Sequence, residues 1–184
     1  MKITVSTLVE APIELVWAAY TSPEDIKCWN AASPDWHTTA ATVDLRPGGR
    51  FSSRMEAKDG SFGFDFAGEY TQVVHLERIE YVLGDRACRV DFKPGAAGIQ
   101  VTVSFDGEAT HSEEQQQSGW QAILDSFRRH VAGKLASEQC RRWAAPPGAK
   151  SVDHARCQGP VTVPRCLRRR LVPRLFTFSV NLRP

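Results

Sequence analysis

Residues 112–136 read SEEQQQSGWQAILDSFRRHVAGKLA, and this stretch decides the fold. Its apolar side chains recur at the spacing of a helix and form one stripe: Trp120, Ile123, Leu124, Phe127 and Val131. Ser112 followed by Gln115 is a capping-box pattern, which marks the start of a helix. The stretch therefore predicts one amphipathic helix, roughly 35–40 Å long because each residue adds about 1.5 Å.

A helix with so wide an apolar stripe needs a broad apolar surface to cover it, and the preceding sequence is the candidate. Residues 62–74 alternate with period 2, which is typical of a strand with one buried face. That face carries Phe62, Phe64, Phe66, Gly68 and Tyr70, and Gly68 could mark a bulge or bend that curls the sheet. Similar patterns predict further strands at residues 3–9, 43–45, 50–57, 79–83, 88–93 and 99–105.

Two short helices are predicted after the first strand, over residues 12–20 and 22–29. A proline stands at the start of the first of them, where helices often begin. Residues 31–39 read as a loop that contains Trp36 and His37. The order of strand, two helices, about six meandering strands and long helix predicts an α+β fold, a curved antiparallel sheet wrapped around the long C-terminal helix. A sheet that curves around one long helix can leave a ligand cavity between the two.

The composition is that of a globular protein. The chain has 184 residues, of which 42% are apolar and 24% are charged. No run of about 18 apolar residues occurs, so we expect no membrane span, and the lack of a signal-peptide pattern favours a cytoplasmic protein. The five cysteines show no CxxC pair and no metal-ligand spacing, and nucleotide-binding and nucleophile motifs are missing. We therefore expect no metal and no cofactor, and we assign no catalytic residue.

Charge divides the chain into two unlike parts. Residues 1–137 hold 13 Lys and Arg against 19 Asp and Glu, a net charge of −6, whereas residues 138–184 hold 10 against 2, a net charge of +8. The second part is rich in proline, cysteine and arginine and has no helical stripe. We expect a folded domain over 1–136 and a disordered basic tail over 137–184. We expect no nucleic-acid binding, because no nucleic-acid-binding fold accompanies the arginine run of the tail.

Four stretches together resemble a known family. They are VEAPIELVWAAYTSPEDIKCWN at 9–30, ASPDWHT at 32–38, VDLRPGGRFSSRMEAKDGSFGFDFAGEY at 43–70 and SEEQQQSGWQAILDSFRRHV at 112–131. Their order and spacing resemble the SRPBCC (START-like, helix-grip) superfamily, specifically the branch related to the C-terminal domain of the activator of Hsp90 ATPase. The hairpin at 84–86 departs from the family, because Gly-Asp-Arg stands where Asp-Gly-Arg is expected. The resemblance implies a cavity that binds lipids, polyketides or other apolar molecules, and some members catalyse aromatic cyclisation or hydrolysis.

We predict ligand-binding residues on the two sides of this cavity. The sheet and the helix contribute Phe64, Phe66, Tyr70, Trp120, Leu124 and Phe127. The alternative is that these side chains only fill the core. Trp36 and His37 lie in the predicted loop near the cavity mouth. His37, beside Asp35, could act as a general base or donate a hydrogen bond, or it could be solvated while Trp36 anchors the loop.

The parity of residues 50–57 leaves two interpretations open. If Phe51 and Met55 face the helix, Arg54 and Glu56 form a pair on the solvent side. With the opposite parity, Arg54 could bind an anionic group inside the cavity.

Three hypotheses about function follow. The leading one is binding of a hydrophobic or aromatic small molecule without a defined reaction. The second is an enzyme of the cyclase or hydrolase type that acts on a polyketide-like substrate, with Asp35, His37 or Arg54 polarising it. The third is a module that interacts with a chaperone, as the family name suggests. A homodimer is left open.

Overall fold

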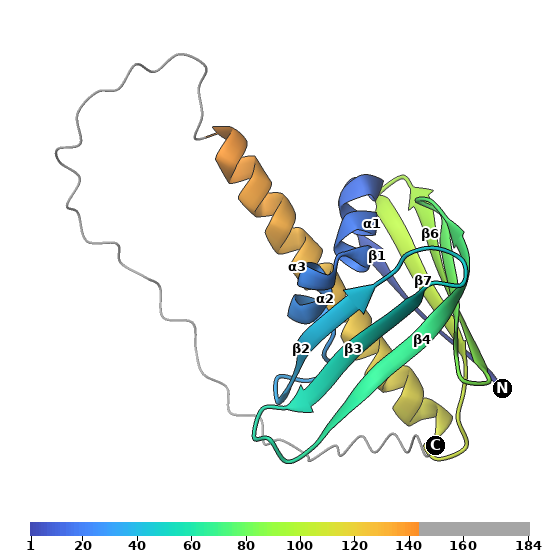
Figure 1. Cartoon of the computed structure of the whole chain (residues 1–184). Coiled ribbons are helices and arrows are strands. Elements are labelled where there is room, and N and C mark those ends of the chain that lie inside the picture. Colours follow the sequence, from blue (N-terminus) through green and yellow to red (C-terminus); the bar gives the residue numbers. More distant parts are fainter. Residues whose placement is uncertain (144–184) are drawn as a thin grey trace. The chain divides into compact units, whose positions relative to one another are not determined.

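The computed structural model describes residues 1–143 as a curled antiparallel sheet that packs against one long helix (Figure 1). The strands are β1 (Lys2–Val9), β2 (Trp36–Val43), β3 (Arg50–Ala57), β4 (Gly63–Val74), β5 (Arg78–Leu83), β6 (Arg86–Gly95) and β7 (Gly98–Asp106). The helices are α1 (Ile13–Thr21), α2 (Pro23–Trp29) and α3 (Glu113–Trp143). The strand order is β1-β7-β6-β5-β4-β3-β2, which confirms the predicted α+β helix-grip fold. Within residues 1–143, none of the helices is long and apolar enough to cross a membrane.

Strict alternation gives the sheet one apolar face. On β7, the buried residues are Ile99, Val101, Val103 and Phe105, and the residues between them are only partly buried. The edge strand β1, which pairs with β7 in regular antiparallel register, shows the same alternation. Burying one such side chain contributes about 1.5–3 kcal/mol to folding, so the inner face supplies much of the stability of the fold.

The helices α1 and α2 form where the sequence predicted them. Ser22 lies between them, and its hydroxyl accepts a hydrogen bond from the backbone amide of Asp25, which caps α2. The indole Nε1 of Trp29 donates a hydrogen bond of 2.9 Å to the carbonyl of Ala19. This bond holds the end of α2 against α1.

The helix α3 starts with the predicted capping box. The amide of Gln115 donates to the hydroxyl of Ser112, and the amide of Ser112 donates to the side-chain oxygen of Gln115, each at 3.2 Å. The helix continues to Trp143, so the predicted end at residue 136 was wrong. The apolar stripe stops before that end, but the following residues are mostly good helix formers and need no apolar face. The predicted tail beyond Trp143, residues 144–184, lies outside the described residues.

Side chains on two sides hold α3 in place. The carboxylate of Asp25 on α2 accepts hydrogen bonds of 2.7 Å from His130 Nε2 and from Lys134 Nζ. Burial acts to raise the pKa of Asp25, but the bonds from Lys134 and His130 more than offset it, so this pKa lies below its usual value. On the other side, Gln121 Nε2 donates a bond of 3.2 Å to the carbonyl of Ser6 on β1.

The loop predicted over residues 31–39 was wrong in its second half. β2 begins at Trp36 and pairs with β3 along its length. A bulge between Thr38 and Ala40 shifts the alternation of side chains, which hides the strand in the sequence. Trp36 and His37 therefore lie on opposite faces of a strand and not together in a loop.

Gly68 makes room for an aromatic ring. A Cβ atom at this position would lie 2.8 Å from Cζ of Phe51 and 2.5 Å from the carbonyl oxygen of Val82. Phe51 stands directly opposite Gly68 on the neighbouring strand. The irregularity that the sequence suggested for Gly68 lies farther along β4, between Tyr70 and Gln72.

The hairpin between β5 and β6 is regular despite its unusual residue order. Leu83 pairs with Arg86, so Gly84 and Asp85 form a two-residue turn. Gly84 has a φ of 65°, a conformation that glycine adopts without strain. The exchange of glycine and aspartate therefore leaves the strand register intact.

Candidate functional site

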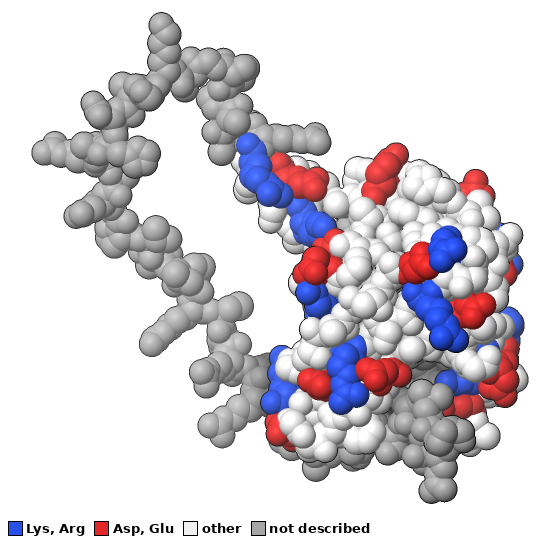
Figure 2. Space-filling model, viewed as in Figure 1, with Lys and Arg blue, Asp and Glu red and all other residues white. Residues whose placement is uncertain are grey.

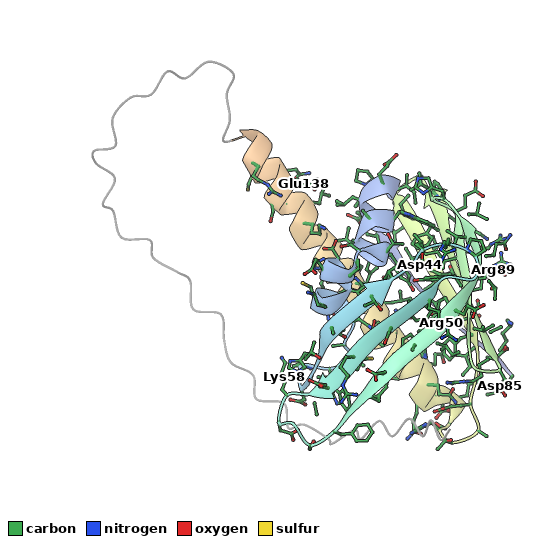
Figure 3. The ribbon with its side chains drawn as sticks, viewed as in Figure 1. Asp44, Arg50, Lys58, Asp85, Arg89 and Glu138 are labelled. Atoms are coloured by element: carbon green, nitrogen blue, oxygen red, sulfur yellow. The ribbon has the colours of Figure 1, made fainter. Side chains whose placement is uncertain are left out.

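The inner face of the sheet and the helices that cover it carry no buried charge. Among residues 1–141, the buried polar side chains are Thr7, Thr38, Ser53 and Gln116. Figure 2 shows both signs of charge on the face in view, and in Figure 3 Lys58 and Asp85 lie at hairpin tips. The uncharged interior between sheet and helices is the candidate site.

Phe66 and Trp120 lie at the border of this interior. Their ring centroids are 6.0 Å apart in an edge-on arrangement between β4 and α3. Trp120 also stacks on Phe105 of β7, with centroids 4.5 Å apart. Both of these predicted site residues are only partly buried.

Tyr70 belongs to a second aromatic group, which is centred on Phe51. The ring of Phe51 lies 5.0 Å from those of Tyr70 and Tyr81 and 5.9 Å from that of Phe66. Phe51, Phe66 and Tyr70 thus form a continuous row along β3 and β4. This row leads from Trp120 toward the buried part of the sheet.

Leu124 and Phe127 lie deepest among the predicted site residues. Leu124 is 2% exposed, and Phe127 is fully buried. The ring of Phe127 packs edge-on against Tyr20 at 5.3 Å and Trp29 at 5.1 Å. These contacts support the core-filling interpretation of Leu124 and Phe127.

Trp36 and Phe64 form a third group together with Phe62, which we name the outer aromatic cluster. The centroids of Trp36 and Phe64 are 5.8 Å apart, and each lies 6.2 Å from that of Phe62. Phe62 is 44% exposed. Because residues two apart on a strand share a face, this cluster continues the row of Phe66 toward the surface.

His37 lies on the outer face of the sheet, away from these rings. It stands opposite Glu56, with 3.9 Å between His37 Nε2 and Glu56 Oε2. Arg54 Nε donates a bond of 2.9 Å to Glu56, which holds the pKa of Glu56 below its usual value, and Asp65 lies 3.7 Å from Arg54. The solvent-side interpretation of Arg54 is confirmed, because the alternate residues of β3 are the buried ones.

Two hydroxyl groups of the inner face have no hydrogen-bond partner among the described residues. Tyr70 is 7% exposed and Ser53 is 5% exposed, yet neither hydroxyl bonds to any residue of the described chain. In residues 1–141, every fully enclosed side-chain nitrogen or oxygen atom has a partner. The hydroxyl oxygens of Tyr70 and Ser53 must therefore border space that a water molecule can enter.

Three further polar groups share this interior. Tyr81 on β5 stands opposite Cys88 on β6, and Tyr20 reaches in from α1. Burial raises the pKa of Tyr20, with Cys88 and Tyr70 adding to the shift, and burial likewise raises the pKa of Tyr81 and that of Tyr70. Burial also raises the pKa of the Cys88 thiol to about 12. All four groups are therefore protonated and neutral near pH 7.

The sequence analysis missed Ser53, Tyr81 and Cys88 as site residues. Each of them occupies an inward position of an alternating strand, so the periodic signal was present. The pairing register was needed to show which positions lie beside the predicted residues. Ser53, for example, stands directly opposite Phe66.

The comparison with protein families agrees with this architecture. The family model described as activator of Hsp90 ATPase homolog 1-like protein (AHSA1) matches residues 10–132, which contain α1, α2, β2 to β7 and most of α3. The chain belongs to the AHSA1 family. This confirms the predicted branch of the SRPBCC superfamily. No match was found among curated proteins.

Solved structures of AHSA1-like proteins are similar to this chain. The AHSA1-like protein from Aeromonas hydrophila is 48% identical, with a TM-score of 0.69, and the match covers 73% of this chain and 94% of that chain. Chr148 from Cytophaga hutchinsonii is 47% identical, with a TM-score of 0.64 and the same two coverages. NE0264 from Nitrosomonas europaea is 21% identical, with a TM-score of 0.65, and the match covers 73% of this chain and 96% of that chain. At this low identity, the match shows only that the two proteins have the same fold.

Proposed function

We propose that this AHSA1 family member binds a hydrophobic or aromatic small molecule between α3 and the inner face of β3 and β4. The observation that carries the proposal is that the hydroxyls of Tyr70 and Ser53, on the two strands that also carry Phe51 and Phe66, have no partner in the described residues and are not fully enclosed. Small-molecule sites typically combine apolar walls with a few placed polar groups. The inner face has this composition.

The predicted site residues take different places in this proposal. Phe66, Tyr70 and Trp120 contact the ligand, because they adjoin the open space or the partly buried border. Trp36 and Phe64 flank its entrance as part of the outer aromatic cluster. Leu124 and Phe127 form the floor below the ligand. His37 has no part in binding, because the sheet separates it from the interior.

An enzyme of the cyclase or hydrolase type has less support. Such chemistry needs an acid or base within reach of the substrate. His37 and Arg54 face outward, where both approach Glu56. Asp35 precedes β2, and its carbonyl accepts a hydrogen bond from the amide of Lys58. The three residues do not converge on the interior.

Docking on a chaperone is a second candidate function. The family is named after an activator of the Hsp90 ATPase, and the outer aromatic cluster leaves Phe62 exposed. Exposed aromatic side chains are enriched at protein interfaces. If this function holds, Phe62→Ala will reduce stimulation of a chaperone ATPase, whereas Phe66→Ala will leave it unchanged.

Native mass spectrometry of the full chain, purified from its expression host, tests the binding proposal. We expect a stoichiometric apolar molecule in the native protein and in His37→Ala, and its loss from Phe66→Ala and Trp120→Ala. The same spectra give the oligomeric state, so they also decide whether a homodimer forms. An empty protein that also fails to bind added naphthalene would contradict the proposal.

A further inference from the structure

The interior holds several polar groups but no charge. Five elements contribute them, namely Tyr20 of α1, Ser53 of β3, Tyr70 of β4, Tyr81 of β5 and Cys88 of β6. Within residues 1–141, no Asp, Glu, Lys, Arg or His side chain is among the buried ones. A ligand in this space therefore meets hydroxyl and thiol groups and aromatic rings, but no counter-ion.

Because the described interior contains no counter-ion, the free-energy cost of binding depends on whether the ligand is charged or neutral. A carboxylate that enters an apolar space loses its hydration, and without a cation this loss costs more than a hydrogen bond returns. A neutral hydroxyl or carbonyl group loses far less. It can regain its bonds from Tyr70 and Ser53, whose hydroxyls have no partner in the described chain.

The protonation of the interior groups supports the same conclusion. Burial raises the pKa of Tyr70 above its usual value, so the phenol keeps its proton and can donate a hydrogen bond to a ligand oxygen. Ser53 can donate or accept. The two hydroxyls can thus serve either an alcohol or a ketone.

We propose that the interior selects neutral molecules that carry a hydroxyl or carbonyl oxygen and rejects the corresponding carboxylates. A ligand oxygen exchanges a hydrogen bond with Tyr70 or with Ser53, which lie at different positions along β3 and β4, while the apolar part lies against Phe51, Phe66 and Trp120. This inference rests on the small-molecule binding proposed above and adds the chemical class of the ligand.

Three probes with the same ring system test the selection: 2-naphthol, naphthalene and 2-naphthoate. At pH 7 the first keeps its phenolic proton, the second has no oxygen, and the third is an anion. Isothermal titration of the full chain is expected to rank their affinities in that order. We expect 2-naphthoate to bind at least about 10-fold more weakly than 2-naphthol, since the interior offers it no cation.

Two variants locate the selecting groups. Tyr70→Phe and Ser53→Ala each remove a hydroxyl and little else. Each is expected to weaken 2-naphthol binding by about 2- to 10-fold, the usual effect of one hydrogen bond, and to leave naphthalene binding unchanged. Ser52→Ala is the matched control, because Ser52 is the neighbour of Ser53 on the outward side of β3.

The outcomes separate this inference from the proposed function. If naphthalene binds but 2-naphthoate binds as tightly as 2-naphthol, the selection is overturned and the binding site remains. If Tyr70→Phe and Ser53→Ala both leave the preference for 2-naphthol intact, the selection does not come from these hydroxyls and the inference fails. If none of the three probes binds, the proposed function and the inference fall together.

Discussion

Phe66 on β4 and Trp120 on α3 face each other edge-on, with ring centroids 6.0 Å apart. Both rings are partly buried, whereas Leu124, one turn along α3 from Trp120, is almost completely enclosed. The residues of the proposed binding site and those of the enclosed core are therefore different residues of the same helix–sheet contact.

The first prediction compares Phe66→Ala with Leu124→Ala. Leu124→Ala should lower the free energy of unfolding by about 2–5 kcal/mol, because it leaves a cavity in an enclosed site. Phe66→Ala should cost less stability but abolish naphthalene binding. Thermal denaturation and calorimetric titration of both variants measure the two effects. Unchanged affinity in folded Phe66→Ala would contradict the assignment of Phe66 to the site.

The second prediction concerns pH and the bonds that Asp25 forms with His130 and Lys134. The pKa of Asp25 is lowered in the folded state, so its contribution to stability is present above the unfolded pKa of about 4. The contribution is lost as the pH falls through the folded-state pKa. Asp25→Asn should therefore lower the melting temperature at pH 7 and make it less sensitive to acid.

Melting curves of the native protein and Asp25→Asn between about pH 2 and 7 measure this difference. Glu14→Gln is the control, because Glu14 is an exposed acidic residue on α1. Parallel acid profiles for native protein and Asp25→Asn would show that Asp25 does not stabilise the fold through its charge.

The third prediction uses two glycines with opposite surroundings. Gly68→Ala would place a Cβ atom 2.5 Å from the carbonyl of Val82 and 2.8 Å from the ring of Phe51, so we expect a large loss of stability. A Cβ atom at Gly133 on α3 would meet no other atom within 4 Å. Because alanine favours a helix more than glycine does, Gly133→Ala should raise the free energy of unfolding by about 1 kcal/mol. Urea denaturation compares them, and a Gly68→Ala variant as stable as Gly133→Ala would contradict the packing described here.

The fourth prediction concerns the chain beyond Trp143. The buried core extends from Ile3 to Val131, so a chain truncated after Trp143 should keep the melting temperature and probe affinity of the full chain. One kcal/mol corresponds to about 3–6 °C in a domain of this size, so a drop of several degrees would be easily seen. Such a drop would show that residues 144–184 contribute to the fold.

Periodicity predicted most of the fold, because a long apolar stripe is typical of a helix and a strict alternation of apolar and polar residues is typical of a strand. The capping box at Ser112 and the inward face of Phe64 to Tyr70 follow from spacing alone. The prediction that Phe62 lies on that face was wrong, because Phe62 precedes β4 and is 44% exposed. The features that were missed depend on non-local geometry. The bulge after Thr38 interrupts the alternation of β2, and the helical residues past 136 have no stripe to mark them.

The candidate site was harder to predict for a related reason. The alternation in the sequence predicted which aromatic residues point inward. It placed Trp36 and His37 together in a loop, however, whereas they are consecutive residues of β2 and therefore lie on opposite faces of the sheet. The importance of Ser53 depends on a missing hydrogen bond, and no pattern in the sequence reveals a missing bond. The fold could therefore be predicted from spacing, whereas the candidate site depends on strand pairing and on contacts between side chains.

The hydrogen bond from Gln121 to the carbonyl of Ser6 connects the detachment of α3 from the sheet with aggregation. Exposed strand edges are templates for pairing with other chains, and this bond places a side chain of α3 on an edge of the sheet. If the first half of α3 detaches, an unprotected β1 edge and the apolar inner face are exposed in the same event. Loss of α3 should therefore lead directly to self-association, and variants that weaken its docking should aggregate before they unfold completely.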